Sequence, residues 1–144
     1  MPLNVYLTFE DNCREAFDFY RSVFGGEYLI VQTFADGPGD MGVPESDGDR
    51  IMHATISLGD SILMGSDTPS NYPQALTPGN NVSLSYTPAS REETDEIFGK
   101  LSEGGTVNMP LADMFWGAYF GSCTDKFGIH WQLNFELPGE QGSD

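Results

Sequence analysis

Positive charge and long apolar runs are both scarce in this sequence. Only 6 Lys and Arg residues stand against 22 Asp and Glu residues, so the 144-residue chain carries a formal net charge of −16. Nucleic acids and anionic lipids are bound through basic surfaces, so we expect direct binding to neither. No stretch reaches the 18 or so apolar residues of a membrane span, and the first residues show no signal-peptide pattern. We therefore expect a cytoplasmic protein.

Cysteine and histidine are also rare, which limits the possible metal sites. Cys13 and Cys123 lie far apart, and neither belongs to a Cys-x-x-Cys or Cys-x-x-His pattern, so zinc-finger and thioredoxin motifs are excluded. The chain has only two histidines, which excludes a His-rich metal cluster. We expect two buried or half-buried thiols. A catalytic Cys123 beside His130 is the less favoured alternative, because neither residue lies in a nucleophile motif.

What is present is enough apolar material for one folded domain. Hydrophobic residues make up 39% of the chain and aromatic residues 12%, a composition that supports a packed core. We expect a single domain over residues 1–137 and a polar tail over 138–144. Residues 35–50 lack periodicity and predict a mobile acidic loop, most simply a solvated connector, with a lid over a pocket as the alternative.

The pattern of strands and helices occurs twice. In the first half, Asn12 and Glu15 predict a capping box that opens an amphipathic helix ending at Gly25-Gly26. In the second half, Ser90 and Glu93 predict the same for a helix ending at Gly104-Gly105. Alternating apolar and β-branched residues predict strands at 5–9, 28–34, 53–58, 61–65, 82–86, 106–111, 118–123 and 130–135.

An internal repeat accompanies this order. At an offset of 77 residues, Val5, Leu7 and Arg14 match Val82, Leu84 and Arg91. The chain is therefore predicted to contain two β-α-β-β-β modules at about 3–67 and 80–136, joined by a linker rich in Pro, Asn, Thr and Ser.

A tandem β-α-β-β-β pair resembles the vicinal oxygen chelate superfamily, which contains glyoxalase I, bleomycin-resistance proteins and extradiol dioxygenases. Over about residues 3–136 the chain looks most like the PhnB-like branch. The stretches that carry this resemblance are 6–13, 19–20, 24–27, 53–54, 59–64, 115–117, Gly121, 124–129 and 131–134. It implies an α+β, glyoxalase/bleomycin-resistance-like fold whose two cupped mixed sheets enclose a cavity, and it implies a homodimer. Some members carry a methyltransferase name, but the chain has no Gly-rich β-α-β fingerprint for an adenosyl cofactor.

The resemblance also indicates where metal ligands would lie. The four places fall on Asn4 or Val5, on Leu63, on Asn81 and on Gln132. Leucine cannot bind a metal, and amides are weak neutral donors. We therefore predict no metal and no cofactor.

Alternation along strands extends this set to a predicted ligand-binding cavity. If Gln132 faces the cavity, His130 and Asn134 do so too, while Trp131, Leu133 and Phe135 pack outside it or against the helices. In the first module, Leu63 facing inward implies that Ser61 and Gly65 also face inward. Phe115 and Trp116 are either core or pocket wall. The predicted ligand-binding residues are Ser61, Leu63, Asn81, Phe115, Trp116, His130, Gln132 and Asn134.

Three functions are compatible with these residues. The favoured one is metal-free binding of a small organic molecule. The second is a glyoxalase- or dioxygenase-like lyase or isomerase that uses either noncanonical metal ligands such as His53 or proton transfer by His130. The third is an acidic module that attracts a basic protein partner. Whether the protein is an enzyme stays open at this point.

Overall fold

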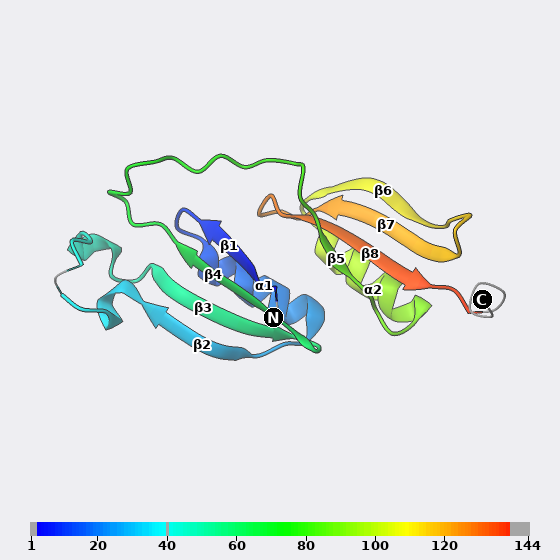
Figure 1. Ribbon diagram of the computed structural model, residues 1–144, viewed down its shortest axis with the longest axis horizontal. Helices are drawn as coiled ribbons and strands as arrows, with labels where there is room; N and C mark the ends of the chain where they lie inside the picture. The colour runs from blue at the N-terminus through cyan, green and yellow to red at the C-terminus, as the bar shows by residue number, and fades with distance from the viewer. Residues whose placement is uncertain (1–2, 40, 139–144) are drawn as a thin grey trace. The chain divides into compact units, whose positions relative to one another are not determined.

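The protein forms two compact units, each with one helix on one four-stranded sheet. The computed structural model describes residues 3–39 and 41–138, and the chain divides into units over Met1–Thr77 and Pro78–Asp144. Figure 1 shows the same order of elements in both units. This confirms the predicted α+β fold with two β-α-β-β-β modules. The predicted polar tail lies, apart from Pro138, outside the described residues.

The first unit places its strands in the order β1-β4-β3-β2. β1 runs parallel to β4, and the other two pairs are antiparallel. The predicted strand at 61–65 continues to Asp67. Its elements are β1 (Val5–Phe9), α1 (Cys13–Phe24), β2 (Tyr28–Thr33), β3 (Ile51–Leu58) and β4 (Ser61–Asp67), with short 3₁₀ turns at Phe34–Asp36 and Glu45–Asp47.

The second unit repeats this topology as β5-β8-β7-β6, with β5 parallel to β8. Its elements are β5 (Leu84–Tyr86), α2 (Arg91–Ser102), β6 (Thr106–Asp113), β7 (Ala118–Thr124) and β8 (His130–Glu136). β5 begins two residues later than predicted, because Val82 is largely exposed, at 71%, and does not join the sheet.

The two helices begin in different ways. At α2 the Ser90 hydroxyl accepts a hydrogen bond from the Glu93 amide at 3.0 Å, as predicted. At α1 the Asn12 side chain forms no capping hydrogen bond. Instead the Cys13 amide donates to Oδ1 of Asp67, at 2.8 Å, from the end of β4. The predicted Asn12–Glu15 capping box is therefore wrong, because a carboxylate distant in sequence satisfies the first free amide.

Both helices are followed by glycine for two separate reasons. Gly25 and Gly104 adopt left-handed backbone angles, φ 80° and 78°, which glycine reaches at little cost. Gly26 and Gly105 lie against neighbouring strands: a Cβ atom there would collide with the backbone carbonyl of Ser57 and of Thr124, respectively. The Gly-Gly pairs therefore end the helices and admit close backbone contact.

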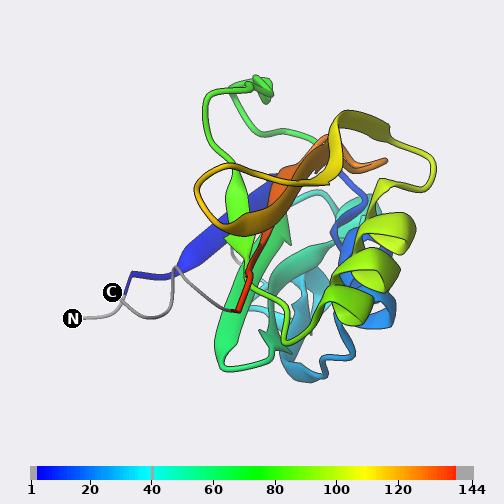
Figure 2. The ribbon, with the colours of Figure 1, turned by 90° about the vertical axis from the view of Figure 1, so that its right-hand side faces the viewer.

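In each unit the helix covers one face of its own sheet (Figure 2). We call the other face the open face. In the first unit the helix-covered side contains Phe17, Tyr20 and Ile56, all fully buried. In the second it contains Leu101 and Leu133, again fully buried. Because side chains alternate along a strand, this packing also fixes which strand residues lie on the open face.

Residues 35–50 are more anchored than the solvated connector that the sequence predicts. Asp47 is only 3% exposed, and its Oδ2 accepts a hydrogen bond from the Ser70 amide at 2.6 Å. Arg50 donates from Nη1 to the carbonyls of Glu10 and Thr68, each at 2.8 Å. These bonds tie the segment to the ends of β1 and β4, which the composition of the loop does not reveal.

The thiols are buried, as predicted. Cys13 and Cys123 are both 0% exposed, and burial raises the pKa of Cys13 to about 12 and of Cys123 to about 11. Thiols in this state are not nucleophiles near neutral pH. Among the described residues, no helix has the length and apolar character needed to cross a membrane.

Candidate functional site

The open face of the second sheet gathers the polar residues predicted on β8. The Tyr119 hydroxyl donates to Asp95 of α2, so β7 residues of the same parity face that helix. Their cross-strand partners Trp131 and Leu133, 2% and 0% exposed, face it as well. By alternation the side chains between them project onto the open face. This places His130, Gln132 and Asn134 together there, opposite Thr124, Ser122 and Phe120 of β7.

Three of these side chains have unused hydrogen-bonding capacity. Within the part of the chain that the structure describes, Gln132, Asn134 and Ser122 make no side-chain hydrogen bond. Each carries donors and acceptors. Ser122 and Phe120 were missed by sequence reasoning, although alternation along 118–124, set against 130–135, was the signal that would have found them.

Aromatic rings adjoin these amides. Trp116 contacts Phe120 with a centroid separation of 5.9 Å, and Phe115 contacts Trp116 at 5.1 Å. Phe115 is 96% exposed and Trp116 52% exposed, so neither is a core residue. The turn that presents them is held by amide-to-carbonyl bonds from Gly117 to Met114 and from Met114 to Ala118. The open face thus joins polar groups to an apolar wall.

His130 also lies on this face, but its ring is fully engaged. Nε2 lies 2.9 Å from the Gly79 carbonyl, which can only accept, so Nε2 carries the proton. In the tautomer with the proton on Nε2, Nδ1 accepts from the Thr124 hydroxyl at 2.8 Å. Thr124 in turn accepts from Asn108 at 3.0 Å. A ring with both nitrogens bonded has no free lone pair for proton transfer, so the geometry favours a structural role.

The site residues predicted in the first unit are not on the open face. Leu63 is 2% exposed and lies on the face covered by α1. Gly65 lies two residues further along β4 and therefore faces the same way as Leu63. A Cβ atom at Gly65 would meet the ring of Phe17 in α1 at 2.8 Å, so this side of β4 faces the helix. Ser61 shares that parity and is exposed at the end of β4. The prediction that Leu63, Ser61 and Gly65 face a cavity is therefore wrong, because Leu63 belongs to the core.

The remaining predicted positions are dispersed. Asn81 is exposed in the segment before β5. Val5 pairs with Leu63 and so shares its face, while Asn4 precedes β1. His53 lies on the open face of the first sheet, where Nε2 is 3.0 Å from the Thr55 hydroxyl and the ring is 5.8 Å from that of Tyr6. The resemblance put metal ligands at four positions. Of these, only Gln132 lies among the polar side chains of the open face.

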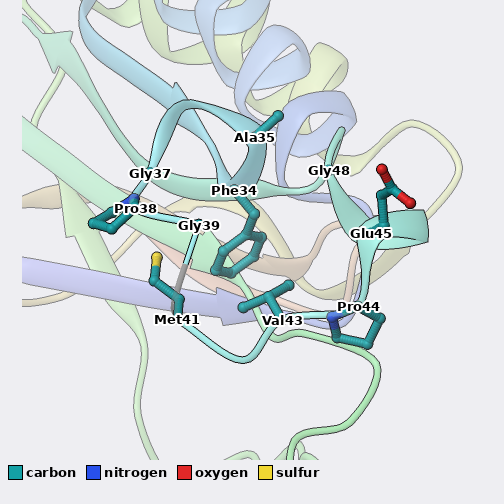
Figure 3. A pocket seen from close by; sticks show the side chains of 10 residues that line it. All are labelled: Phe34, Ala35, Gly37, Pro38, Gly39, Met41, Val43, Pro44, Glu45 and Gly48. Atoms are coloured by element: carbon teal, nitrogen blue, oxygen red, sulfur yellow. The ribbon is translucent and has the colours of Figure 1, made fainter.

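A separate hollow of about 460 Å³ lies in the loop between β2 and β3. The side chains of Phe34, Pro38, Met41 and Val43 surround it, and Glu45 is the one charged side chain among its described lining residues (Figure 3). No residue of the predicted site lines it. With so few polar side chains it provides apolar contact but no acid–base machinery.

Metal-binding side chains are not clustered in either unit. Among the described residues of each, no group of three or more His, Cys, Asp or Glu side chains is placed to hold an ion. The side chains of the open face that keep free donors and acceptors, two amides and a hydroxyl, are neutral, whereas divalent ions favour carboxylate and imidazole donors.

Comparison with known proteins identifies the family. Residues 3–134 match the family model described as 3-demethylubiquinone-9 3-methyltransferase. The crystal structure of PA1353 from Pseudomonas aeruginosa is 38% identical, with a TM-score of 0.84, over 96% of this chain and 99% of that one. The PhnB protein from Bacillus cereus is 32% identical, with a TM-score of 0.74, over 94% and 99% of the two chains.

More distant structures share the fold alone. A glyoxylase/bleomycin resistance protein/dioxygenase domain from Frankia is 16% identical, with a TM-score of 0.67, over 97% of this chain and 94% of that one. The two repeated units, the matched model and the similarity to the PhnB protein agree with one another. The chain therefore belongs to the PhnB-like, 3-demethylubiquinone-9 3-methyltransferase family.

Proposed function

We propose that this PhnB-like protein binds a small, neutral, partly apolar organic molecule without a metal ion. The observation that carries the proposal is the open face of the second sheet. There Gln132, Asn134 and Ser122 keep free donors and acceptors beside the rings of Phe120 and Trp116. A few convergent polar groups next to aromatic surface are typical of small-molecule sites.

The charge of this face favours a neutral ligand over an anion. Neither β7 nor β8, the strands that form this face, contains a Lys or Arg residue. An anion would have to lose its hydration without gaining an opposite charge. Amides, by contrast, bind carbonyl, hydroxyl or amide groups of neutral molecules well.

The family's methyltransferase description finds no support at the junctions between strand and helix. A nucleotide-type cofactor is commonly held at a Gly-rich turn between a strand and the following helix. Here residues 10–12 and 87–90 form these junctions, and neither contains glycine. This supports a binding function over methyl transfer.

Native mass spectrometry of gently purified protein tests the proposal first, because it reports small-molecule and metal adducts together. A library of neutral organic molecules would then be screened by thermal shift and tryptophan fluorescence. We expect hits that change the emission of the half-exposed Trp116, and the Trp116→Phe variant should lose that signal. Stoichiometric nickel, zinc, iron or manganese by elemental analysis would contradict metal-free binding.

The Gln132→Leu variant tests the position of the site. It keeps the bulk of the side chain and deletes the amide, so one hydrogen bond to the hit is lost. Such a bond contributes about 0.5–1.5 kcal/mol, which corresponds to a roughly 2- to 13-fold weaker affinity. Gln74→Leu, at an exposed position outside both sheets, is the matched control and should bind as wild type does. Equal binding by Gln132→Leu and wild type would place the ligand elsewhere.

A further inference from the structure

The hollow in the loop between β2 and β3 plays no part in the proposed function, yet it has the size and lining of a small-molecule site. Its volume of about 460 Å³ lies within the range of about 300–1,000 Å³ that is common for ligand pockets. Apolar side chains of Phe34, Pro38, Met41 and Val43 line it (Figure 3). An aromatic ring and a flexible thioether can contact apolar ligands of many shapes.

Hydrogen bonds tie the walls of the hollow to one another and to the rest of the first unit. The Ala35 amide donates to the Gly48 carbonyl at 3.0 Å, which joins lining residues from the two ends of the loop. The Asn71 side chain donates from Nδ2 to the Gly42 carbonyl at 2.9 Å, which fastens the middle of the loop to the segment after β4. The hollow is therefore supported by the fold of the unit and not by the loop alone.

Glu45 is the one lining residue with a charged side chain among those described, and its carboxylate is available to a ligand. Other carboxylates of the loop are occupied: Asp36 accepts from the Thr33 amide at 3.0 Å, and Asp47 pairs with Arg50 at 3.4 Å. The side chain of Glu45 is exposed and, within the part of the chain that the structure describes, enters no hydrogen bond or ion pair. It can therefore turn toward a bound cation.

The basic residue of the loop does not neutralise this carboxylate. Residues 35–50 contain five acidic residues and one basic residue, Arg50. Arg50 donates to the carbonyls of Glu10 and Thr68 and pairs with Asp47. The surplus of negative charge repels an anionic ligand. A neutral apolar ligand would displace part of the water around the carboxylate without replacing its hydrogen bonds. A cation has neither disadvantage.

We propose that this hollow is a second binding site, which takes a small organic cation with an ammonium group on an apolar, aromatic body. The ammonium group pairs with Glu45 at the rim, and the body packs against Phe34 and Met41. A cation close to the face of the Phe34 ring gains a further electrostatic attraction. This site goes beyond the proposed function, because it differs in ligand charge and shares no residue with the open face of the second sheet.

Methyl NMR of the full chain tests the location of the site, with isotope-labelled methionine methyl groups and naphthylmethylammonium as the ligand. We expect the Met41 signal to shift in a saturable way, because the naphthyl ring lies next to that side chain. Met109, on β6 of the second unit, is the matched control: it is 44% exposed, as Met41 is, and its signal should stay in place. Met41→Leu and Met109→Leu assign the two signals.

Ligands of similar shape and different charge test the chemical class. Naphthylmethanol replaces the ammonium group by a neutral hydroxyl, and naphthoate carries a carboxylate instead. We expect naphthylmethylammonium to bind most tightly, naphthylmethanol more weakly, and naphthoate not to shift the Met41 signal. The affinity of the ammonium ligand should also fall as salt screens its attraction to the carboxylate.

The Glu45→Gln variant tests the role of the carboxylate, since it keeps the shape of the side chain and removes its charge. We expect it to bind naphthylmethylammonium roughly two- to fivefold more weakly than wild type, as is typical of an exposed ion pair, and to bind naphthylmethanol as wild type does. Glu92→Gln removes the same charge from an exposed position of α2 in the second unit and should leave both affinities unchanged. Circular dichroism checks that both variants are folded.

Any one of three results would overturn the proposal. The first is a Met41 signal that does not move, or moves no more than that of Met109. The second is binding of naphthylmethanol or naphthoate as tight as that of the ammonium ligand. The third is a Glu45→Gln variant that loses no more affinity than Glu92→Gln, as expected if the acidic surface attracts any cation. None of these results bears on the neutral-ligand site, because Gln132 and its neighbours belong to the second unit.

Discussion

Each unit contains a buried aspartate near the end of a strand whose carboxylate organises the backbone around it. Asp67 is 4% exposed and accepts from the amides of Cys13 and Ile51, both at 2.8 Å. Asp125 is 3% exposed and accepts from the amides of Phe127 and Ile129, and from the indole Nε1 of Trp131 at 2.9 Å. A buried carboxylate is tolerated when its oxygens are satisfied in this way.

We expect Asp125→Asn to destabilise the protein by about 1–3 kcal/mol, because the amide group turns one accepting oxygen into a donor that faces another donor. Urea denaturation monitored by fluorescence measures this loss, and the emission of the buried Trp131 should shift to longer wavelength. Asp113→Asn, whose exposed carboxylate pairs with Arg91 on the surface, is the control and should cost less than about 1 kcal/mol. If both variants lost the same free energy of unfolding, the buried hydrogen bonds of Asp125 would stabilise the fold no more than a surface ion pair does.

Single residues of the candidate site were predictable only where strand parity was fixed locally. On β8, the large apolar residues Trp131 and Leu133 mark the buried face. Alternation along the strand therefore predicts that Gln132 and Asn134 lie on the opposite face. On β4, the resemblance placed Leu63 in a cavity, whereas Gly65 and the Phe17 ring above it show that this parity faces α1. Nothing in the sequence near Leu63 reveals which helix residue lies above it.

At the level of elements, the two helix starts show why one N-cap was predicted correctly and the other was not. The bond from Glu93 to Ser90 joins residues three apart, so a local pattern is enough to identify it. The carboxylate that binds the Cys13 amide is 54 residues away in the chain. Most strands and both helices follow from local periodicity, but contacts of this kind depend on the tertiary fold.

This contrast predicts different costs for two similar substitutions. Ser90→Ala should lower the free energy of unfolding by about 1 kcal/mol, the usual cost of losing an N-cap. Asn12→Ala should cost less than about 0.5 kcal/mol, because the Asn12 side chain caps nothing. Paired chemical-denaturation curves measure both values. A larger loss for Asn12→Ala than for Ser90→Ala would restore the sequence-based assignment of the cap.

For the whole molecule, the dominant electrostatic feature is an excess of unpaired acids. Among the described residues, four ion pairs form, which join Arg21 to Asp18, Arg50 to Asp47, Arg91 to Asp113 and Lys100 to Glu96. The chain has 22 acidic and 6 basic residues, so most of its carboxylates are not balanced by a cation. Folding brings these charges together, and the resulting repulsion destabilises the compact state.

Salt should therefore stabilise the folded protein. At physiological ionic strength the Debye length is about 8 Å, which is short enough to screen much of this surface repulsion. We expect the melting temperature to rise from low to moderate sodium chloride concentration, as measured by calorimetry at constant protein concentration. Potassium chloride should have the same effect, which separates screening from sodium binding. A flat or falling melting temperature would show that self-repulsion is not a significant part of the stability.

The close contacts at Gly26 and Gly105 have a consequence for how the internal repeat can change with time. At most other positions along the modules, one side chain can replace another while the fold persists, so the resemblance between the halves can fade. At these two positions any Cβ would collide with the carbonyl of Ser57 or Thr124, and every substitution would push a strand out of its sheet. This geometry selects for glycine at both positions, so Gly26 and Gly105 can be used to align the two modules with each other.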